Sequence, residues 1–261
     1  MQIPIQNIYY LLCYAWDRLE ERELVQVSAQ DCLTLPDLLS QVLVNGITHL
    51  VKRGIFHAYL STEQTEATLR GRLLLTASLR QNTFVQGKAV CEIDDFSANQ
   101  LPNQILKSTL ALLLRIPTLS NRNAVLNLYD RLATVSTLPL TDTLFARQPR
   151  YPSLYPFLLN VCELVHRNLL VEEGKGSYLF RDFWRDEKQM ARLFEDFIRN
   201  FYRHELPLWH VHRENITWKF IASAEDQALL PLMQTDVSLE SKDRQIILDA
   251  KYYTETFQRN F

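Results

Sequence analysis

The sequence predicts an α+β or mixed α/β protein, with a mainly helical N-terminal domain that carries a small β-sheet and a C-terminal domain in which helices precede strands. Apolar residues recur at helical spacing over 35–53 and again between 103 and 132. An amphipathic segment at 186–204 is followed by three strand-like segments. The chain has 261 residues, which is enough for two domains of ordinary size.

Three helices and three strands are expected in the first half of the chain. Pro36 begins the helix 35–53 and Gly54 ends it, because proline suits the first helical turn and glycine suits the position after the last one. Leucine-rich spacing indicates two more helices, around 106–114 and 125–132. The strand-like segments are 55–60, 67–74 and 89–96.

The second half follows a linker at 147–156, which holds three prolines. We expect a helix over 156–170 and a second helix over 186–204. Strands are expected at about 210–220, 232–240 and 245–252.

Composition excludes several classes of protein. The six glycines form neither a G-x-G-x-x-G nor a G-x-x-x-x-G-K-[S/T] loop, so the phosphate-binding loops of Rossmann and P-loop proteins are absent from the sequence. The four cysteines are far apart, which is typical of a reducing cytosol and not of a disulfide or zinc-ribbon scaffold. With no signal peptide and no apolar run of about 18 residues, we expect a cytoplasmic protein that has no membrane partner.

The most informative stretch is LMQTDVSLESKDRQIILDAKYY, residues 232–253. The polar tetrapeptide SKDR predicts a hairpin turn in which Glu240 faces Gln245. Counting back along both strands then places Asp236 directly opposite Asp249. Opposed Cβ atoms in an antiparallel pair lie about 4.5–5.5 Å apart.

Two carboxylates that close repel each other unless a proton or a divalent cation lies between them. Asp236 and Asp249 are therefore candidate Mg²⁺ ligands, and Mg²⁺ would polarise a phosphodiester and activate water. Lys251 shares a strand face with Asp249 and could stabilise transition-state charge. The alternative is a solvated sheet face on which Lys251 only neutralises Asp249. The apolar run IIL before Asp249 favours the first interpretation, since it predicts a strand covered on both faces.

Other residues that carry chemistry are more ambiguous. Glu195 lies about 130° from the centre of the apolar stripe of its helix, so it could reach a metal site or face solvent. His210 and His212 share a strand face, but no nearby Cys or third His completes a metal site, and we interpret them as structural.

A Glu-bearing helix, a Thr-Asp pair and a short hairpin into DAK together resemble the PD-(D/E)xK nuclease core, with threonine where proline is usual. More specifically, the chain resembles the McrC family, the nuclease subunits of the McrBC 5-methylcytosine-dependent restriction system. The matching segments span nearly the whole chain in family order: NIYYLLCYAW (7–16), GRLLLTASLR (71–80), NQILKSTLALLL (103–114), VSTLPLT (135–141), GKGSYLFRDFWRDEKQM (174–190), LFEDFIRNFY (193–202) and LPLMQTDVSL to LDAKYY (230–253).

This resemblance implies that the chain has two domains with different functions. Residues 1–148 would dock onto a McrB-like AAA+ GTPase hexamer, and residues 149–261 would form the restriction-endonuclease-like PD-(D/E)xK domain. The complex would cut double-stranded DNA carrying modified cytosine. GTP would be used by the partner and not by this chain, in agreement with the missing phosphate loop.

The resemblance also implies roles for single residues. Asp236, Asp249 and the Ala250 carbonyl would be Mg²⁺ ligands, Lys251 would be the catalytic lysine, and Glu195 would be the helix carboxylate of the site. The family core continues after its DxK strand with a helix and a strand, whereas this sequence ends ten residues after Lys251. We therefore expect an incomplete nuclease domain. The chain would be a Mg²⁺-dependent DNA endonuclease subunit or, alternatively, a truncated non-catalytic adapter that stimulates the GTPase without cutting.

Overall fold

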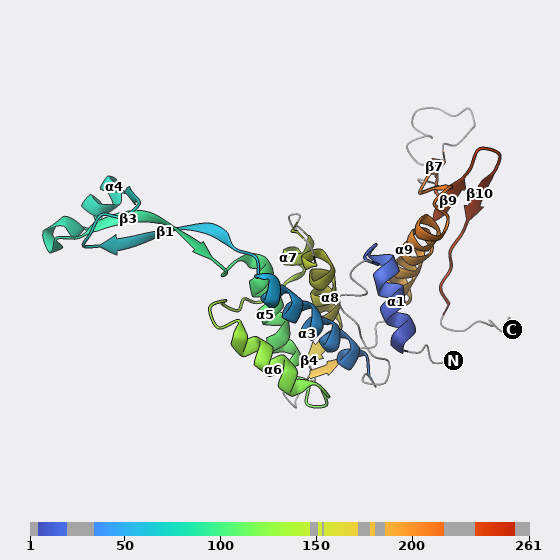
Figure 1. The fold of residues 1–261 in the computed structure, drawn as a ribbon, viewed down its shortest axis with the longest axis horizontal. Coiled ribbons are helices and arrows are strands. Elements are labelled where there is room, and N and C mark those ends of the chain that lie inside the picture. The colour runs from blue at the N-terminus through green and yellow to red at the C-terminus, as the bar shows by residue number, and fades with distance from the viewer. Residues whose placement is uncertain are drawn as a thin grey trace, which may run out of the picture.

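The computed structural model describes most of the chain, and its elements lie in three regions along the longest axis (Figure 1). A helical body occupies the middle, a slender β-arm projects from one side of it, and helices α1 and α9 with a small sheet lie on the other side. Helices combined with small antiparallel sheets confirm the predicted α+β class. The described residues are 5–19, 34–146, 151–152, 154–171, 178–180, 186–216 and 233–253.

The helices and strands have the following bounds. The helices are α1 (Ile5–Ala15), α3 (Leu35–Arg53), α4 (Leu75–Arg80), the 3₁₀ helix η1 (Thr83–Gln86), α5 (Leu101–Leu113), α6 (Arg122–Arg131), α7 (Asp142–Ala146), α8 (Tyr155–Asn168) and α9 (Glu187–Glu205). The strands are β1 (Ala58–Glu66), β2 (Arg72–Leu73), β3 (Ala89–Ser97), β4 (Leu169–Val171), β5 (Tyr178–Phe180), β6 (His210–His212), β7 (Asn215–Ile216), β8 (Met233–Gln234), β9 (Val237–Glu240) and β10 (Gln245–Leu248).

Helix α3 begins and ends where the sequence predicts. Thr34 and Asp37 form a capping box, in which each side chain accepts a hydrogen bond from the backbone N–H of the other residue. Gly54 follows the last turn with a φ of 98°, a value that suits glycine. Asp37 also accepts hydrogen bonds from the backbone N–H and the hydroxyl of Ser120, so the helix start is tied to a loop 83 residues away.

The core of the body is formed by α3, α5 and α8 with α6 packed against them. Their apolar faces supply the fully buried side chains, among them Leu39, Ile105 and Phe157. Gly46 allows a close approach of α3 to α8, because a Cβ there would lie 2.4 Å from a Leu158 methyl group. Helix α8 therefore belongs to this core, although it follows the proposed linker.

The arm consists of residues 58–97 and contains β1, β2, β3, α4 and η1. Its sheet has the order β1-β3-β2, with both pairs antiparallel. Strand β1 continues to Glu66, beyond the predicted end near residue 60, because β3 pairs with the polar segment STEQTE along its whole length. Nine of the fourteen exposed large hydrophobic side chains among the described residues lie on this arm, so it presents an unusually apolar surface.

The third region joins the two ends of the chain. Helix α1 packs along α9, where the Tyr14 ring meets Phe197 edge-on at 5.6 Å between centroids. Asn200 of α9 donates to the carbonyls of Tyr14 and Ala15 at the end of α1. The N-terminal helix thus supports the C-terminal sheet region. The predicted boundary at residue 148 stays a prediction.

The small sheet of this region has the order β10-β9-β6 and is antiparallel throughout. One face packs on α9 through a cluster of Val211, Val237 and Leu239. The prediction that the IIL run is covered on both faces is wrong for the described residues, since Ile246 and Ile247 are 41% and 53% exposed. The physical reason is that α9 packs on β6 and β9, whereas β10 lies at the edge of the sheet, away from the covered cluster. No helix in the described part of the chain is long and apolar enough to span a membrane.

Candidate active site

The hairpin of β9 and β10 has the predicted register. Gln245 pairs with Glu240 and Leu248 pairs with Val237, so the next positions along the two strands are Asp236 and Asp249. The ladder ends before that pair, but the backbone N–H of Ala250 donates a hydrogen bond of 2.8 Å to Oδ2 of Asp236. Asp236 and Asp249 therefore stay side by side at the end of the hairpin.

Asp249 and Lys251 form an ion pair on the same side of the strand, with 2.7 Å between Nζ and Oδ2. The hydrogen bond from Lys251 holds the pKa of Asp249 below its ordinary value, and the neighbouring Asp236 carboxyl group acts in the same direction. The same hydrogen bond from Asp249 raises the pKa of Lys251. Both side chains are mostly exposed, so this end of the hairpin is open to a large substrate.

Glu195 on α9 is half-buried beside the hairpin. Burial raises the pKa of Glu195, and the charge of Asp236 raises it further, whereas Arg213 opposes the shift. The Arg213 guanidinium donates to Glu195 Oε2 at 2.6 Å. The helix carboxylate suggested by the sequence is thus within electrostatic range of Asp236, and a cation that the sequence reasoning missed lies beside it. Arg213 directly follows the strand segment HVH, and this position was the sequence signal for a cation near the site.

Thr235 fixes the backbone immediately before Asp236. It is buried, its N–H donates to the Glu214 carbonyl at 2.9 Å, and its hydroxyl lies 2.9 Å from that of Ser238. Its hydroxyl oxygen also accepts from the Glu214 N–H at 3.0 Å. Thr235 therefore ties the backbone before Asp236 to the segment at Glu214, directly before β7.

The four residues expected at the site, Glu195, Asp236, Asp249 and Lys251, thus gather at one end of the β9–β10 hairpin. Neighbouring carboxylates repel each other unless a proton or a cation lies between them, and oxygen ligands suit Mg²⁺. Ala250 takes part through its N–H, which donates to Asp236. This donor set fits a divalent cation beside a lysine, the arrangement expected for phosphodiester hydrolysis.

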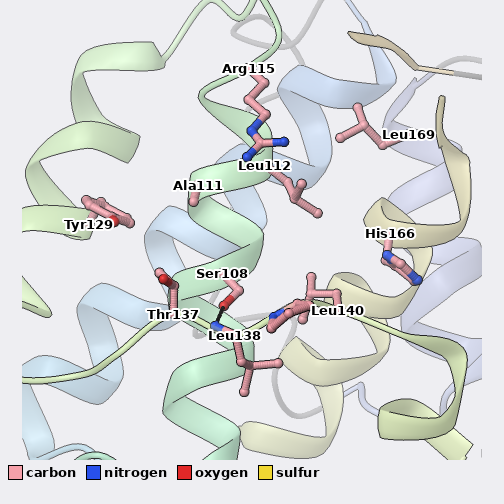
Figure 2. A pocket seen from close by; sticks show the side chains of 11 residues that line it. Ser108, Ala111, Leu112, Arg115, Tyr129, Thr137, Leu138, Leu140, His166 and Leu169 are labelled. Atoms are coloured by element: carbon pink, nitrogen blue, oxygen red, sulfur yellow. Dashed lines mark hydrogen bonds between the residues drawn. The ribbon is translucent and has the colours of Figure 1, made fainter. Parts of the chain in front are cut away.

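A separate pocket of about 710 Å³ lies in the helical body, between α5, α8 and the segment 137–140 (Figure 2). Arg115, Tyr129 and His166 lie around it, and the Leu138 N–H donates to the Ser108 hydroxyl at its floor. None of its lining residues is a carboxylate. The pocket therefore offers no alternative site for the metal chemistry.

Comparisons with known proteins agree with the motif resemblance. A family model described as "McrBC 5-methylcytosine restriction system component" matches residues 6–259. The chain belongs to this family. It is 35% identical over 266 residues to the Type IV methyl-directed restriction enzyme EcoKMcrBC of Escherichia coli K12, and the match covers 98% of this chain and 75% of that protein.

Two solved structures of the McrBC system share the fold. One is the refined half-complex from the tetradecameric assembly of Thermococcus gammatolerans McrB AAA+ hexamers with bound McrC, with a TM-score of 0.56 and 19% identity over 94% of this chain. The other is the cryo-EM structure of the Thermococcus gammatolerans McrBC complex, with a TM-score of 0.55 and 21% identity over 78% of this chain. The present chain spans 56% and 59% of the matched chains, so it corresponds to little more than half of their length.

Proposed function

We propose that this McrBC family member is the DNA endonuclease subunit of a GTP-dependent restriction complex that recognises modified cytosine. The observation that carries the proposal is the placement of Asp236, Asp249 and Lys251 at one end of the β9–β10 hairpin. With Glu195 on the neighbouring helix, this arrangement matches the Glu-helix, Asp and DxK order of the PD-(D/E)xK nucleases.

Asp236, Asp249 and the Ala250 carbonyl would hold Mg²⁺. The bound ion would supply Lewis-acid polarisation of the scissile phosphate and a more acidic water. Lys251 would place its positive charge beside the phosphate oxygens, where negative charge increases during hydrolysis. Asp249 keeps Lys251 protonated and oriented, because the ion pair raises the pKa of the ammonium group.

Glu195 and Arg213 would form the outer wall of the site. The ion pair holds Glu195 beside Arg213, and Arg213 offsets part of the negative charge that three carboxylates concentrate there. The Arg213 guanidinium is also suited to contact a DNA phosphate, since its planar donors match phosphate oxygens.

The arm would dock onto a McrB-like AAA+ GTPase hexamer. It projects from the helical body (Figure 1) and carries exposed apolar side chains such as Tyr59 and Val85, which are 75% and 80% exposed. Contiguous exposed apolar surface marks interaction sites in soluble proteins. The proposal agrees with the sequence, which has no phosphate-binding loop of its own, so GTP would bind to the partner.

The decisive experiment combines the purified chain with its cognate AAA+ GTPase, GTP, Mg²⁺ and a plasmid carrying 5-methylcytosine. We expect cleavage that requires the chain, the GTPase, GTP and Mg²⁺ and that depends on 5-methylcytosine in the plasmid. Cleavage should be lost in the Lys251→Ala variant. The chain alone should neither bind nor hydrolyse GTP. Binding to the partner and stimulation of its GTPase without any DNA cleavage would instead support the non-catalytic adapter.

A further inference from the structure

His210, His212 and Glu240 form a second cluster of possible metal ligands on the same small sheet. His210 and Glu240 are directly paired across β6 and β9, and His212 lies two residues further along β6, on the same face. Each residue offers one ligand atom, and these three atoms lie within 4.8 Å of one another. The third ligand, which the sequence reasoning did not find among Cys and His residues, is the glutamate of the neighbouring strand.

The two imidazole rings are stacked, and one buried ring nitrogen of His212 has no structural task. The rings stack with 4.4 Å between centroids and 18° between planes. Nδ1 of His212 is buried and has no hydrogen-bond partner within the described part of the chain. A buried polar nitrogen without a partner carries a free-energy cost, and in native proteins it calls for a specific explanation.

We propose that His210, His212 and Glu240 bind a Zn²⁺ ion, with water as the fourth ligand. Two imidazoles and one carboxylate form a common zinc donor set with an open fourth position. Ligand atoms placed tetrahedrally at about 2.1 Å from zinc lie about 3.4 Å apart, so small side-chain rotations within the 4.8 Å cluster suffice. Imidazole nitrogen favours zinc over Mg²⁺, which prefers oxygen ligands.

This zinc site is distinct from the carboxylate site at the end of the hairpin. Glu240 and Asp236 lie on the same strand segment four residues apart, which corresponds to about 13 Å at 3.3 Å per residue. The zinc ion would join the edge strand β6 to the central strand β9. Asp236 is the residue directly before β9. Because the ligands come together only in the folded sheet, zinc binding would stabilise the part of the structure that carries the active site.

The test measures zinc binding by the metal-free full chain in competition with a chromogenic chelator. We expect one tightly bound equivalent of Zn²⁺ per chain, and at least about tenfold weaker binding in the His210→Gln and Glu240→Gln variants. The matched control is His204→Gln, because His204 also lies beside a carboxylate, that of Asp17 at 2.6 Å, but belongs to no three-ligand cluster among the described residues. This control should bind zinc as the wild type does, and a millimolar excess of Mg²⁺ should not displace the ion.

Two further readouts separate metal binding from effects on folding. The metal-free variants should melt at the temperature of the metal-free wild type, whereas Zn²⁺ should raise the melting temperature of the wild type and of His204→Gln only. Co²⁺ bound to the wild type should give the intense visible absorption of a tetrahedral site. Absence of a bound equivalent in the wild type, or equal zinc affinity in His210→Gln, Glu240→Gln and the wild type, would overturn the proposal.

Discussion

The backbone N–H of Ala250 donates a 2.8 Å hydrogen bond to the carboxylate of Asp236, one position beyond the last ladder pair of the β9–β10 hairpin. This bond keeps the two strands together at the point where Asp249 and Lys251 follow. The Asp236 side chain therefore has two tasks, since it closes the hairpin end and faces the second carboxylate. Variants at Asp236 have to separate these tasks.

We expect Asp236→Asn to lower DNA cleavage by at least about a hundredfold while the fold and partner binding persist. The amide oxygen of asparagine can still accept from Ala250, but the negative charge that would attract Mg²⁺ is lost. Asp236→Ala should reduce cleavage equally and should in addition destabilise the hairpin by about 1 kcal/mol, because the hydrogen bond is removed. Cleavage of a methylated plasmid and thermal unfolding measure the two effects.

Lys242→Ala is the matched control for Lys251→Ala, because Lys242 is an exposed lysine in the turn of the same hairpin. Removing it should leave cleavage within about twofold of the wild type, since it lies at the other end of the strands. Cleavage by Asp236→Asn or Lys251→Ala at the wild-type rate would contradict the proposed site.

A negative charge on the arm should weaken partner binding. We expect Val85→Glu to reduce affinity for the AAA+ GTPase by about 10- to 100-fold, because a buried apolar contact contributes about 1.5–3 kcal/mol. Stability should be unchanged, since Val85 is 80% exposed in the chain alone. Leu208→Glu is the control, because Leu208 is 92% exposed but lies in the sheet region. Equal losses for both variants in a binding titration would argue against arm docking.

Much of the candidate site could be predicted from the sequence because it depends on local chemistry. The turn tetrapeptide sets the register, and the register sets the positions of Asp236 and Asp249. Arg213 could not be placed beside Glu195, because that ion pair joins a helix to the end of a strand and depends on how they pack. Glu240 could not be predicted as a partner of His210 either, because the pairing of β6 with β9 is a tertiary contact.

The fold shows the same division between local and tertiary signals. Helix α3 was predicted with both ends correct, because Pro36 and Gly54 are signals within a few residues of each end. The arm was only partly predicted, because the polar segment STEQTE has no apolar alternation and becomes a strand by pairing with β3. Packing of α1 on α9 joins segments about 190 residues apart and has no local signal.

Asn200 should be important for the stability of the region that carries the site. Its amide donates to the carbonyls of Tyr14 and Ala15 at 2.9 and 3.1 Å, in the last turn of α1, where fewer N–H groups follow to satisfy the carbonyls. We expect Asn200→Ala to lower the free energy of unfolding by about 1–3 kcal/mol. Asn127→Ala, an exposed asparagine on α6, should change it by less than about 0.5 kcal/mol. Urea unfolding of both variants is the measurement, and equal stabilities would refute a role for this contact.

Asp37 should contribute to stability through its charge. Its carboxylate accepts hydrogen bonds from the hydroxyls of Thr34 and Ser120 and from both backbone N–H groups, although the residue is only 3% exposed. We expect Asp37→Asn to lower the free energy of unfolding by about 1.5–3 kcal/mol, because asparagine replaces one of the two acceptor oxygens with an NH₂ donor. Asp130→Asn, at an exposed position of α6, should cost less than about 0.5 kcal/mol.

The stability difference between the wild type and Asp37→Asn should depend on pH in a defined direction. Burial raises the pKa of Asp37, but the hydrogen bonds from Thr34 and Ser120 outweigh it together, so the pKa lies below the ordinary value near 3.8. As the pH falls, the unfolded chain therefore takes up this proton before the folded chain does. The difference should be fully present above the ordinary carboxyl pKa and should shrink as the pH falls through the lowered pKa of the folded state. Urea unfolding of both proteins between neutral and acidic pH measures it, and a difference that stays constant, or grows toward acid, would show that the Asp37 charge does not stabilise the helix start.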